Sequence, residues 1–272
     1  MTPDEVLRTL EELERKGVVR EESGFWQLSD EQPFLPERQR RFRLAIAKRK
    51  IAERGARLVA RIPFVRFVGL VNTVAYESPS AASDIDLFIV TSPGRLWLTR
   101  ALVTAAVHLR GWRRHGRKVS DRLCLSFFVT IRALNLGALK LPYDPYLAYW
   151  VAGVVPLWGA ETYGSFMSLN TWAVERLPNR FALSLPYARL LGGEFFLKTF
   201  AERLLGGRIG NKLNSMSRMF QLHRHKRHVS SRLWQKSTAV VVTDDVMKFH
   251  ETDQRETLAE AFRMRIASLY GS

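Results

Sequence analysis

The sequence predicts a mixed α/β fold, in which a strand–helix–strand core is preceded by a basic helix and followed by a mainly helical region. Three apolar, β-branched runs have the length of buried strands, and they are residues 64–71, 83–90 and 123–129. Between the second and third runs, a Ser-Pro-Gly turn at 92–94 begins a helical pattern that continues to about Gly111. This order predicts a core with a mixed sheet at residues 62–140, with the helix packed on one sheet face.

The first thirty residues predict a helix followed by a β-hairpin. Thr2 can cap the helix, Pro3 suits its first position, and Glu5 completes a capping box. Two short apolar runs then flank a Ser-Gly turn at 23–24. A helix followed by a hairpin resembles the second half of a winged helix-turn-helix unit, although this segment is too short for all three of its helices. We therefore expect either a winged-helix-like DNA reader or a small docking module at residues 1–30.

Residues 31–61 predict one long helix with a basic exterior. The segment 37–61 holds ten Arg or Lys residues against two acids. Apolar residues recur along it at helical spacing, and they are Leu44, Ala47, Ile51, Leu58 and Val59. We expect these residues to form the buried stripe and the basic residues to face solvent.

From Pro142 onward the sequence predicts a helical C-terminal domain, residues 141–272, with one further strand. Asp144 caps a helix that begins at Pro145 and continues to Val155, where Pro156 would break it. The remaining expected elements are helices at 160–176, 185–205, 208–222 and 256–270, and a strand at 239–243.

Two carboxylates, Asp84 and Asp86, lie at the start of the second core strand. Because side chains alternate between the faces of a strand, both carboxylates point the same way, while Ile85 and Leu87 point into the opposite layer. Two carboxylates side by side are costly unless a cation lies between them. The pattern therefore predicts a divalent-metal site that bridges the carboxylates to a phosphate. The alternative is a solvated strand start that carries two acids.

The order of strand, hydroxyl-bearing turn, loop and Ser-Asp-Ile-Asp at 83–86 resembles the nucleotidyltransferases of the DNA polymerase beta superfamily. The resemblance covers about residues 62–132. It implies a nucleotidyltransferase-like core in which Asp84 and Asp86 hold Mg²⁺ and serve catalysis. By the same resemblance the nucleotide-binding residues are Asn72, Thr73 and Ser83. The implied activity is transfer of a nucleoside monophosphate from a Mg²⁺-bound nucleoside triphosphate to an acceptor. We expect nucleic acid as the acceptor, with a protein or a small molecule as the alternatives.

Two positions depart from the pattern of that superfamily. Asn72-Thr73 stands where the superfamily has Gly-Ser, but Asn tolerates the left-handed backbone and Thr keeps the hydroxyl. The strand 123–129 carries no acid where the superfamily has a third carboxylate. The acids that could replace it are Asp121, Asp244 and Asp245. Two interpretations stay open: an active transferase, and a catalytically decayed core that acts as a nucleic-acid-binding protein.

The formal net charge of +16 favours a polyanionic partner. Basic residues gather in three clusters, in the 37–61 helix, at 110–118 and at 223–228. Three clusters in one chain predict RNA or DNA as the partner, with an anionic lipid surface as the alternative. The expected nucleic-acid-binding residues are Arg40, Arg41, Lys48, Arg49, Arg113, Arg114, Arg224 and Lys226.

Further features of the sequence concern the compartment of the protein. Its single cysteine, Cys124, lies in an apolar strand, which predicts a buried thiol and a reducing compartment. The first residues carry acids where a signal peptide would be basic and then apolar, and no apolar run reaches the length of a membrane span. We expect a soluble, cytoplasmic protein. The histidines at 223, 225 and 228 lie among Arg and Lys, whose charge opposes bound zinc.

Overall fold

The computed structural model describes residues 2–29, 34–177, 195–228, 239–249 and 254–270. Six strands form one mixed sheet in the order β6-β3-β4-β5-β8-β7. These strands are β3 (Val65–Val71), β4 (Ile85–Thr91), β5 (Leu123–Thr130), β6 (Val155–Trp158), β7 (Val240–Val242) and β8 (Val246–Phe249). The three strands expected in the core lie side by side at the centre of this sheet.

The connections between these central strands make the sheet mixed. After β3 the chain forms the short helix α3 (Asn72–Ala75) and returns as β4, which is antiparallel to β3. Helix α4 (Leu96–Leu109) then carries the chain back, so that β5 pairs with β4 in parallel. The mixed α/β core expected from the sequence is thereby confirmed.

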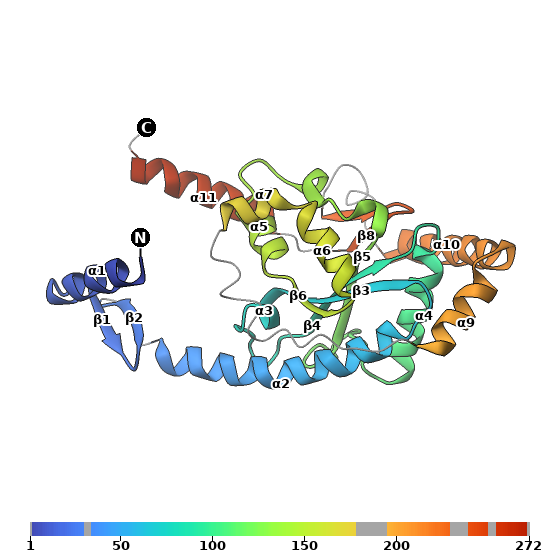
Figure 1. The fold of residues 1–272 in the computed structure, drawn as a ribbon, viewed down its shortest axis with the longest axis horizontal. Helices are drawn as coiled ribbons and strands as arrows, with labels where there is room; N and C mark the ends of the chain where they lie inside the picture. The colour runs from blue at the N-terminus through green and yellow to red at the C-terminus, as the bar shows by residue number, and fades with distance from the viewer. Residues whose placement is uncertain (1, 30–33, 178–194, 229–238, 250–253, 271–272) are drawn as a thin grey trace.

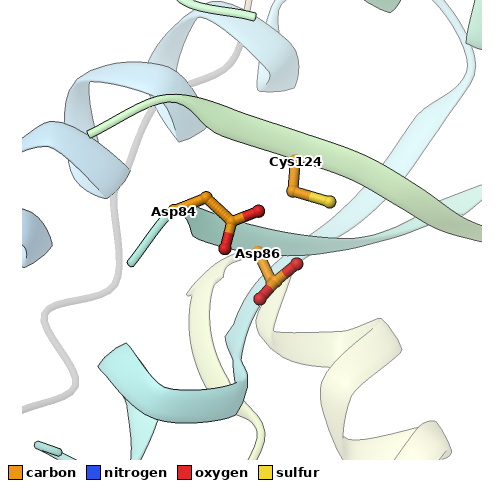
Figure 2. Close-up of side chains that lie close together, drawn as sticks. All are labelled: Asp84, Asp86 and Cys124. Carbon is orange, nitrogen blue, oxygen red and sulfur yellow. The ribbon is translucent and has the colours of Figure 1, made fainter. Parts of the chain in front are cut away.

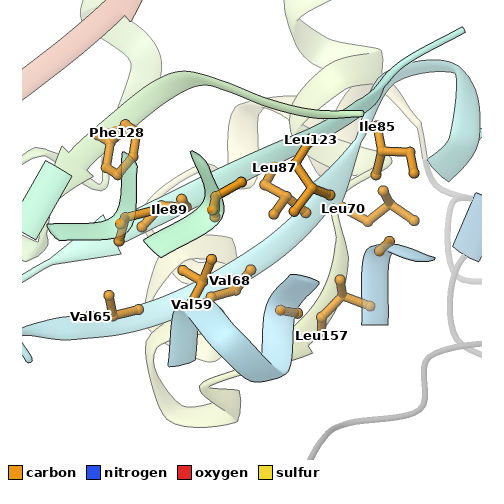
Figure 3. Packing of buried hydrophobic residues seen from close by; sticks show 14 of the residues in the cluster. Val59, Val65, Val68, Leu70, Ile85, Leu87, Ile89, Leu123, Phe128 and Leu157 are labelled. Carbon is orange, nitrogen blue, oxygen red and sulfur yellow. The ribbon is translucent and has the colours of Figure 1, made fainter. Parts of the chain in front are cut away.

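Two helical layers enclose the sheet (Figure 1). Helix α2 (Leu35–Ala60) and α4 cover one face, where Ile85, Leu87 and Ile89 pack (Figure 3). The other face carries Phe88 and Val90. Its covering helices are α5 (Pro145–Ala152), α6 (Ala160–Ser168) and α7 (Thr171–Arg176), and two short 3₁₀ helices precede them, η1 (Ile131–Ala133) and η2 (Leu136–Leu139). The alternation expected along the second core strand is therefore present.

Helix α2 approaches the sheet very closely at Gly55. A Cβ at this position would lie 2.6 Å from a methyl carbon of Leu123, so a larger side chain would require the Leu123 side chain to move. The buried face of α2 is lined by Ala45, Ala52, Ala56 and Val59. Of the expected apolar stripe, Val59 is buried, and Ile51 and Leu58 are partly buried against the core. Ala47 is exposed, so the expectation is wrong at that position, and the closest packing is through the smaller residues Ala45, Ala52 and Ala56.

The helix predicted to continue to Val155 ends earlier. It stops at Ala152, and residues 155–158 form β6, an edge strand that pairs antiparallel with β3. Proline is tolerated at the edge of a sheet, so Pro156 lies within a strand here and does not break a helix. Because β6, β8 and β7 join the same sheet, the core extends beyond the boundary expected at residue 140.

The N-terminal segment consists of α1 (Pro3–Arg15) and a hairpin of β1 (Val19–Glu22) and β2 (Phe25–Leu28). The predicted capping box is present, since Glu5 N donates to Thr2 Oγ1 and Thr2 N donates to the Glu5 carboxylate. No residue of α1 is buried, and the segment lies beyond the N-terminal end of α2 (Figure 1).

Three further helices complete the described chain: α9 (Phe196–Leu205), α10 (Arg208–His228) and α11 (Arg255–Tyr270). The helix expected at 185–205 is present from residue 196, and residues 185–194 lie outside the described part of the chain. The strand expected at 239–243 is present as β7. No helix among the described residues is both long enough and apolar enough to cross a membrane.

Candidate functional site

Two carboxylates, Asp84 directly before β4 and Asp86 within it, meet a thiol at one end of the central sheet. Asp84, Asp86 and Cys124 each offer a ligand atom, and these atoms all lie within 4.8 Å of one another. Figure 2 shows the three side chains close together near the starts of β4 and β5. The sequence predicted that Asp84 and Asp86 share a face, and this is confirmed.

Cys124 joins this cluster because of the pairing between β4 and β5. In the parallel ladder, Asp86 lies opposite Cys124, and an irregularity in the register follows before Phe88 pairs with Phe127. The residue of β5 that lies beside the carboxylates is thus a cysteine and not an acid. The sequence indicated only a buried thiol, because the register of two distant strands cannot be read from either strand alone.

Asp86 is partly buried and is held by Asn72. Burial raises the pKa of the Asp86 carboxyl, and the neighbouring Asp84 raises it further, while a hydrogen bond from Asn72 opposes both effects. The Asn72 amide donates to Asp86 Oδ2 at 2.8 Å. Asn72 has a φ of 59°, which is the left-handed conformation expected for the residue in place of glycine. Its side chain therefore has a role that glycine could not provide.

Asp84 is neutralised by an arginine from the loop that follows α4. Arg114 Nη1 lies 2.6 Å from Asp84 Oδ2 and 3.9 Å from Cys124 Sγ. Burial raises the pKa of the Cys124 thiol to about 12, and the charge of Asp86 contributes to the rise. At neutral pH the cluster therefore consists of two acids, a neutral thiol and one guanidinium.

The other residues expected to bind the nucleotide lie next to this cluster. Thr73 is exposed in the first turn of α3, directly after Asn72. Ser83 precedes Asp84, but its hydroxyl accepts a hydrogen bond from Ser80 N at 2.9 Å and lies 3.1 Å from Ser80 Oγ. The Ser83 side chain therefore shapes the loop before β4.

None of the acids considered as a third carboxylate joins the cluster among the described residues. Asp121 is turned away and forms an ion pair with Lys48 at 2.6 Å. Asp244 accepts hydrogen bonds from Trp97 and Arg218. Asp245 bonds Thr130 at the opposite end of β5, on the order of 20 Å away at the rise of a β-strand.

Lys48 does not belong to the basic exterior of α2. It lies on the buried face of the helix, where its ammonium donates to the carbonyls of Ala81 and Ser83 and pairs with Asp121. The expectation that Lys48 contacts nucleic acid is therefore corrected: its ammonium is enclosed, and it holds the loop that leads into β4. The spacing of Ala45, Lys48 and Ala52 along the helix could have indicated this position.

The other basic residues of α2 divide between the loop before β4 and solvent. Arg49 is 3.8 Å from Glu77, and its side chain is only 14% exposed. Arg40 and Arg41 both pair with Glu37, and Arg41 also donates to Ser78. The exposed basic residues of the helix are Arg40, Arg43, Lys50, Arg54 and Arg57.

The remaining residues expected to bind nucleic acid lie beyond α2. Arg114 belongs to the carboxylate cluster, whereas Arg113 and Arg224 line a cavity beside α4. Lys226 lies within α10, but its side chain is outside the described residues. Of these arginines, one therefore lies at the carboxylate cluster and two lie at the cavity beside α4.

The chain matches no protein-family model, no curated protein and no solved structure.

Proposed function

We propose that this chain is a nucleotidyltransferase-like protein that binds a nucleoside triphosphate together with Mg²⁺ at Asp84 and Asp86. The observation that carries the proposal is the pair of carboxylates on one face of β4, with Asp86 partly buried against Asp84. Such a pair is costly unless a cation shares it. Carboxylate oxygens suit Mg²⁺, which commonly completes its coordination with phosphate oxygens.

The surrounding residues support this assignment by their chemistry. When bound, Mg²⁺ would neutralise the triphosphate and polarise its α-phosphate. Asp84 and Asp86 would hold the cation, and Asn72 keeps Asp86 oriented through its amide. Thr73 would donate its exposed hydroxyl to a phosphate oxygen. Arg114 would exchange its contact with Asp84 for one with the triphosphate, because guanidinium groups pair well with phosphate.

The third position of the cluster favours binding over transfer. Nucleotidyl transfer needs a base or a further cation ligand beside the attacking hydroxyl. The third side chain of the cluster is that of Cys124, and its raised pKa keeps it protonated and a poor base at neutral pH. We therefore infer that the chain holds a nucleotide and contacts nucleic acid through the exposed basic residues of α2.

A second candidate is an active transferase that uses the same carboxylates. It is favoured by the cost of keeping Asp86 charged beside Asp84, a cost that a site without function has no reason to maintain. In this case the acceptor hydroxyl would be activated by a group outside the described residues or by water.

Calorimetric titration of ATP in the presence of Mg²⁺ tests the proposal. Binding should be saturable, should disappear with EDTA, and should weaken at least about tenfold in Asp84→Asn, as the loss of a charged contact predicts. Asp4→Asn, which removes an acid from α1 far from the sheet, should bind as the wild type does. Equal affinity in Asp84→Asn and the wild type would contradict the proposal, and incorporation of labelled nucleotide into RNA would favour the second candidate.

A further inference from the structure

A cavity of about 330 Å³ lies between α4 and α10, separate from the carboxylate cluster. Helix α10 packs against α4 at the edge of the fold (Figure 1). Arg100 reaches this cavity from α4, Arg113 from the loop after α4, and Arg224 from α10. Helix α4 covers the sheet face opposite to the one that carries Asp86, so the two places are on different sides of the core.

The charge of this cavity is not balanced by the residues that line it. No carboxylate is among the lining residues in the described part of the chain. Burial, together with the positive charges of Arg113 and Arg224, lowers the pKa of Arg100 to about 10. The guanidinium still carries its charge at neutral pH. Three like charges around one cavity are unfavourable unless an anion joins them.

Arg100 is fixed in place, but its hydrogen-bonding capacity is not fully used. Its Nη1 donates to Gln221 Oε1 at 2.5 Å, and Gln221 in turn donates to the carbonyl of Trp97. Its guanidinium also lies 4.9 Å from the centre of the Phe249 ring. Its Nε is buried without a hydrogen-bond partner. A neutral amide and an aromatic ring orient this arginine, but neither neutralises it.

We propose that this cavity binds a backbone phosphate of a single-stranded nucleic acid. Arginine forks match phosphate oxygens, and the volume suits a single nucleotide unit. The ring of Phe220 lines the cavity and is 68% exposed, which leaves a surface on which a base can stack.

The same loop connects this cavity with the carboxylate cluster. Arg113 lines the cavity, and the next residue, Arg114, pairs with Asp84. A strand held at Arg113 would therefore pass close to the nucleotide proposed at Asp84. This last step rests on the proposed function, whereas the phosphate site itself does not.

The test uses a fluorescein-labelled single-stranded RNA decamer and inorganic pyrophosphate as separate probes of the full chain. Arg113→Gln combined with Arg224→Gln avoids the buried Arg100 and should weaken decamer binding by about tenfold or more for each lost charged contact. Lys212→Gln removes an equally positive residue from the exposed part of α10 and should leave the affinity almost unchanged. Phe220→Ala should weaken the decamer but not pyrophosphate, because only the decamer carries a base.

Three outcomes would overturn the proposal. The first is decamer affinity that is equal in the double variant and in Lys212→Gln. The second is a double variant that binds pyrophosphate more weakly but binds the decamer with unchanged affinity, which would make this a site for small phosphate compounds. The third is a Phe220→Ala variant that weakens both probes equally. A wild-type chain that binds the decamer but does not bind ATP with Mg²⁺ would contradict the proposed function and leave the phosphate site standing.

Discussion

Asp86 and Cys124 lie directly opposite each other on the parallel strands β4 and β5. The Asp86 carboxylate on one strand thus faces a thiol on its partner, and the Asp84 carboxylate lies within 4.8 Å of both groups. The chemistry of the cluster therefore depends on what stands at position 124.

Replacing Cys124 by Asp should create a third carboxylate in the cluster. The affinity for Mg²⁺ should rise by about tenfold, because affinity for a hard cation grows with the number of charged oxygen ligands. Without the cation, three carboxylates repel one another, so EDTA should lower the melting temperature of Cys124→Asp far more than that of the wild type. Cys124→Ser, of similar size and uncharged, should respond to EDTA as the wild type does. An EDTA response of Cys124→Asp that matches the serine variant would show that position 124 does not face the site.

Replacing Arg114 by Gln should have opposite effects on the two components of the proposed ligand. Its guanidinium occupies Asp84 Oδ2, so its removal should strengthen binding of Mg²⁺ alone by about two- to fivefold, the range expected for an exposed ion pair. The affinity for the triphosphate should fall, because a phosphate partner is lost. Arg117→Gln, in the same loop but outside the cluster, is the control for net charge. Calorimetry that shows both affinities moving in the same direction would contradict this role.

Lys48 and Lys50 offer a matched pair on α2. Lys48→Met should lower the free energy of unfolding by about 1–3 kcal/mol, because two carbonyls of the loop before β4 and the Asp121 carboxylate lose their donor. Lys50 is exposed, so Lys50→Met should leave stability unchanged and reduce the salt dependence of nucleic-acid binding. Urea denaturation measures the effect of each variant on stability, and binding titrations at several salt concentrations measure its effect on nucleic-acid binding. Equal stability of the two variants would show that the Lys48 contacts contribute nothing.

Glu202 makes the docking of α9 sensitive to acid. Burial would raise the pKa of this carboxyl, but hydrogen bonds from Arg66 and from the backbone of Phe64 outweigh it and lower the pKa below the ordinary 4.5. A lowered pKa means that the folded state binds fewer protons, so the stabilisation is present above pH 4.5 and is lost as the pH falls below it. Urea denaturation below this pH should give a smaller loss of stability in Glu202→Gln than in the wild type. Glu11→Gln, on exposed α1, should lose stability with falling pH as the wild type does. If the stability of Glu202→Gln falls with pH to the same extent, Glu202 is not the source of the acid sensitivity.

The central strands and their shared carboxylate face could be predicted from the sequence. Alternation along residues 83–90 was sufficient to place Asp84 and Asp86 together, since it depends only on the local geometry of a strand. The tolerance of Asn for a left-handed backbone likewise predicted the conformation of position 72. Both inferences concern neighbours in the chain.

The features that could not be predicted depend on contacts between distant segments. Cys124 enters the cluster through the register of β4 with β5, and a residue's partner across strands is a tertiary property. Pro156 is accommodated because β6 lies at the edge of the sheet. In the sequence, Arg100 is a single charged residue in an otherwise apolar helix. It lines a cavity only because α10 packs against α4.

Electron paramagnetic resonance of Mn²⁺ in the presence of ATP tests the central claim most directly. Mn²⁺ takes the same carboxylate and phosphate ligands as Mg²⁺, and its free signal falls as it binds. We predict a saturable, ATP-dependent site in the wild type and in Asp4→Asn that is lost in the double variant Asp84→Asn and Asp86→Asn. Undiminished Mn²⁺ binding by the folded double variant would contradict a metal–nucleotide site at these carboxylates.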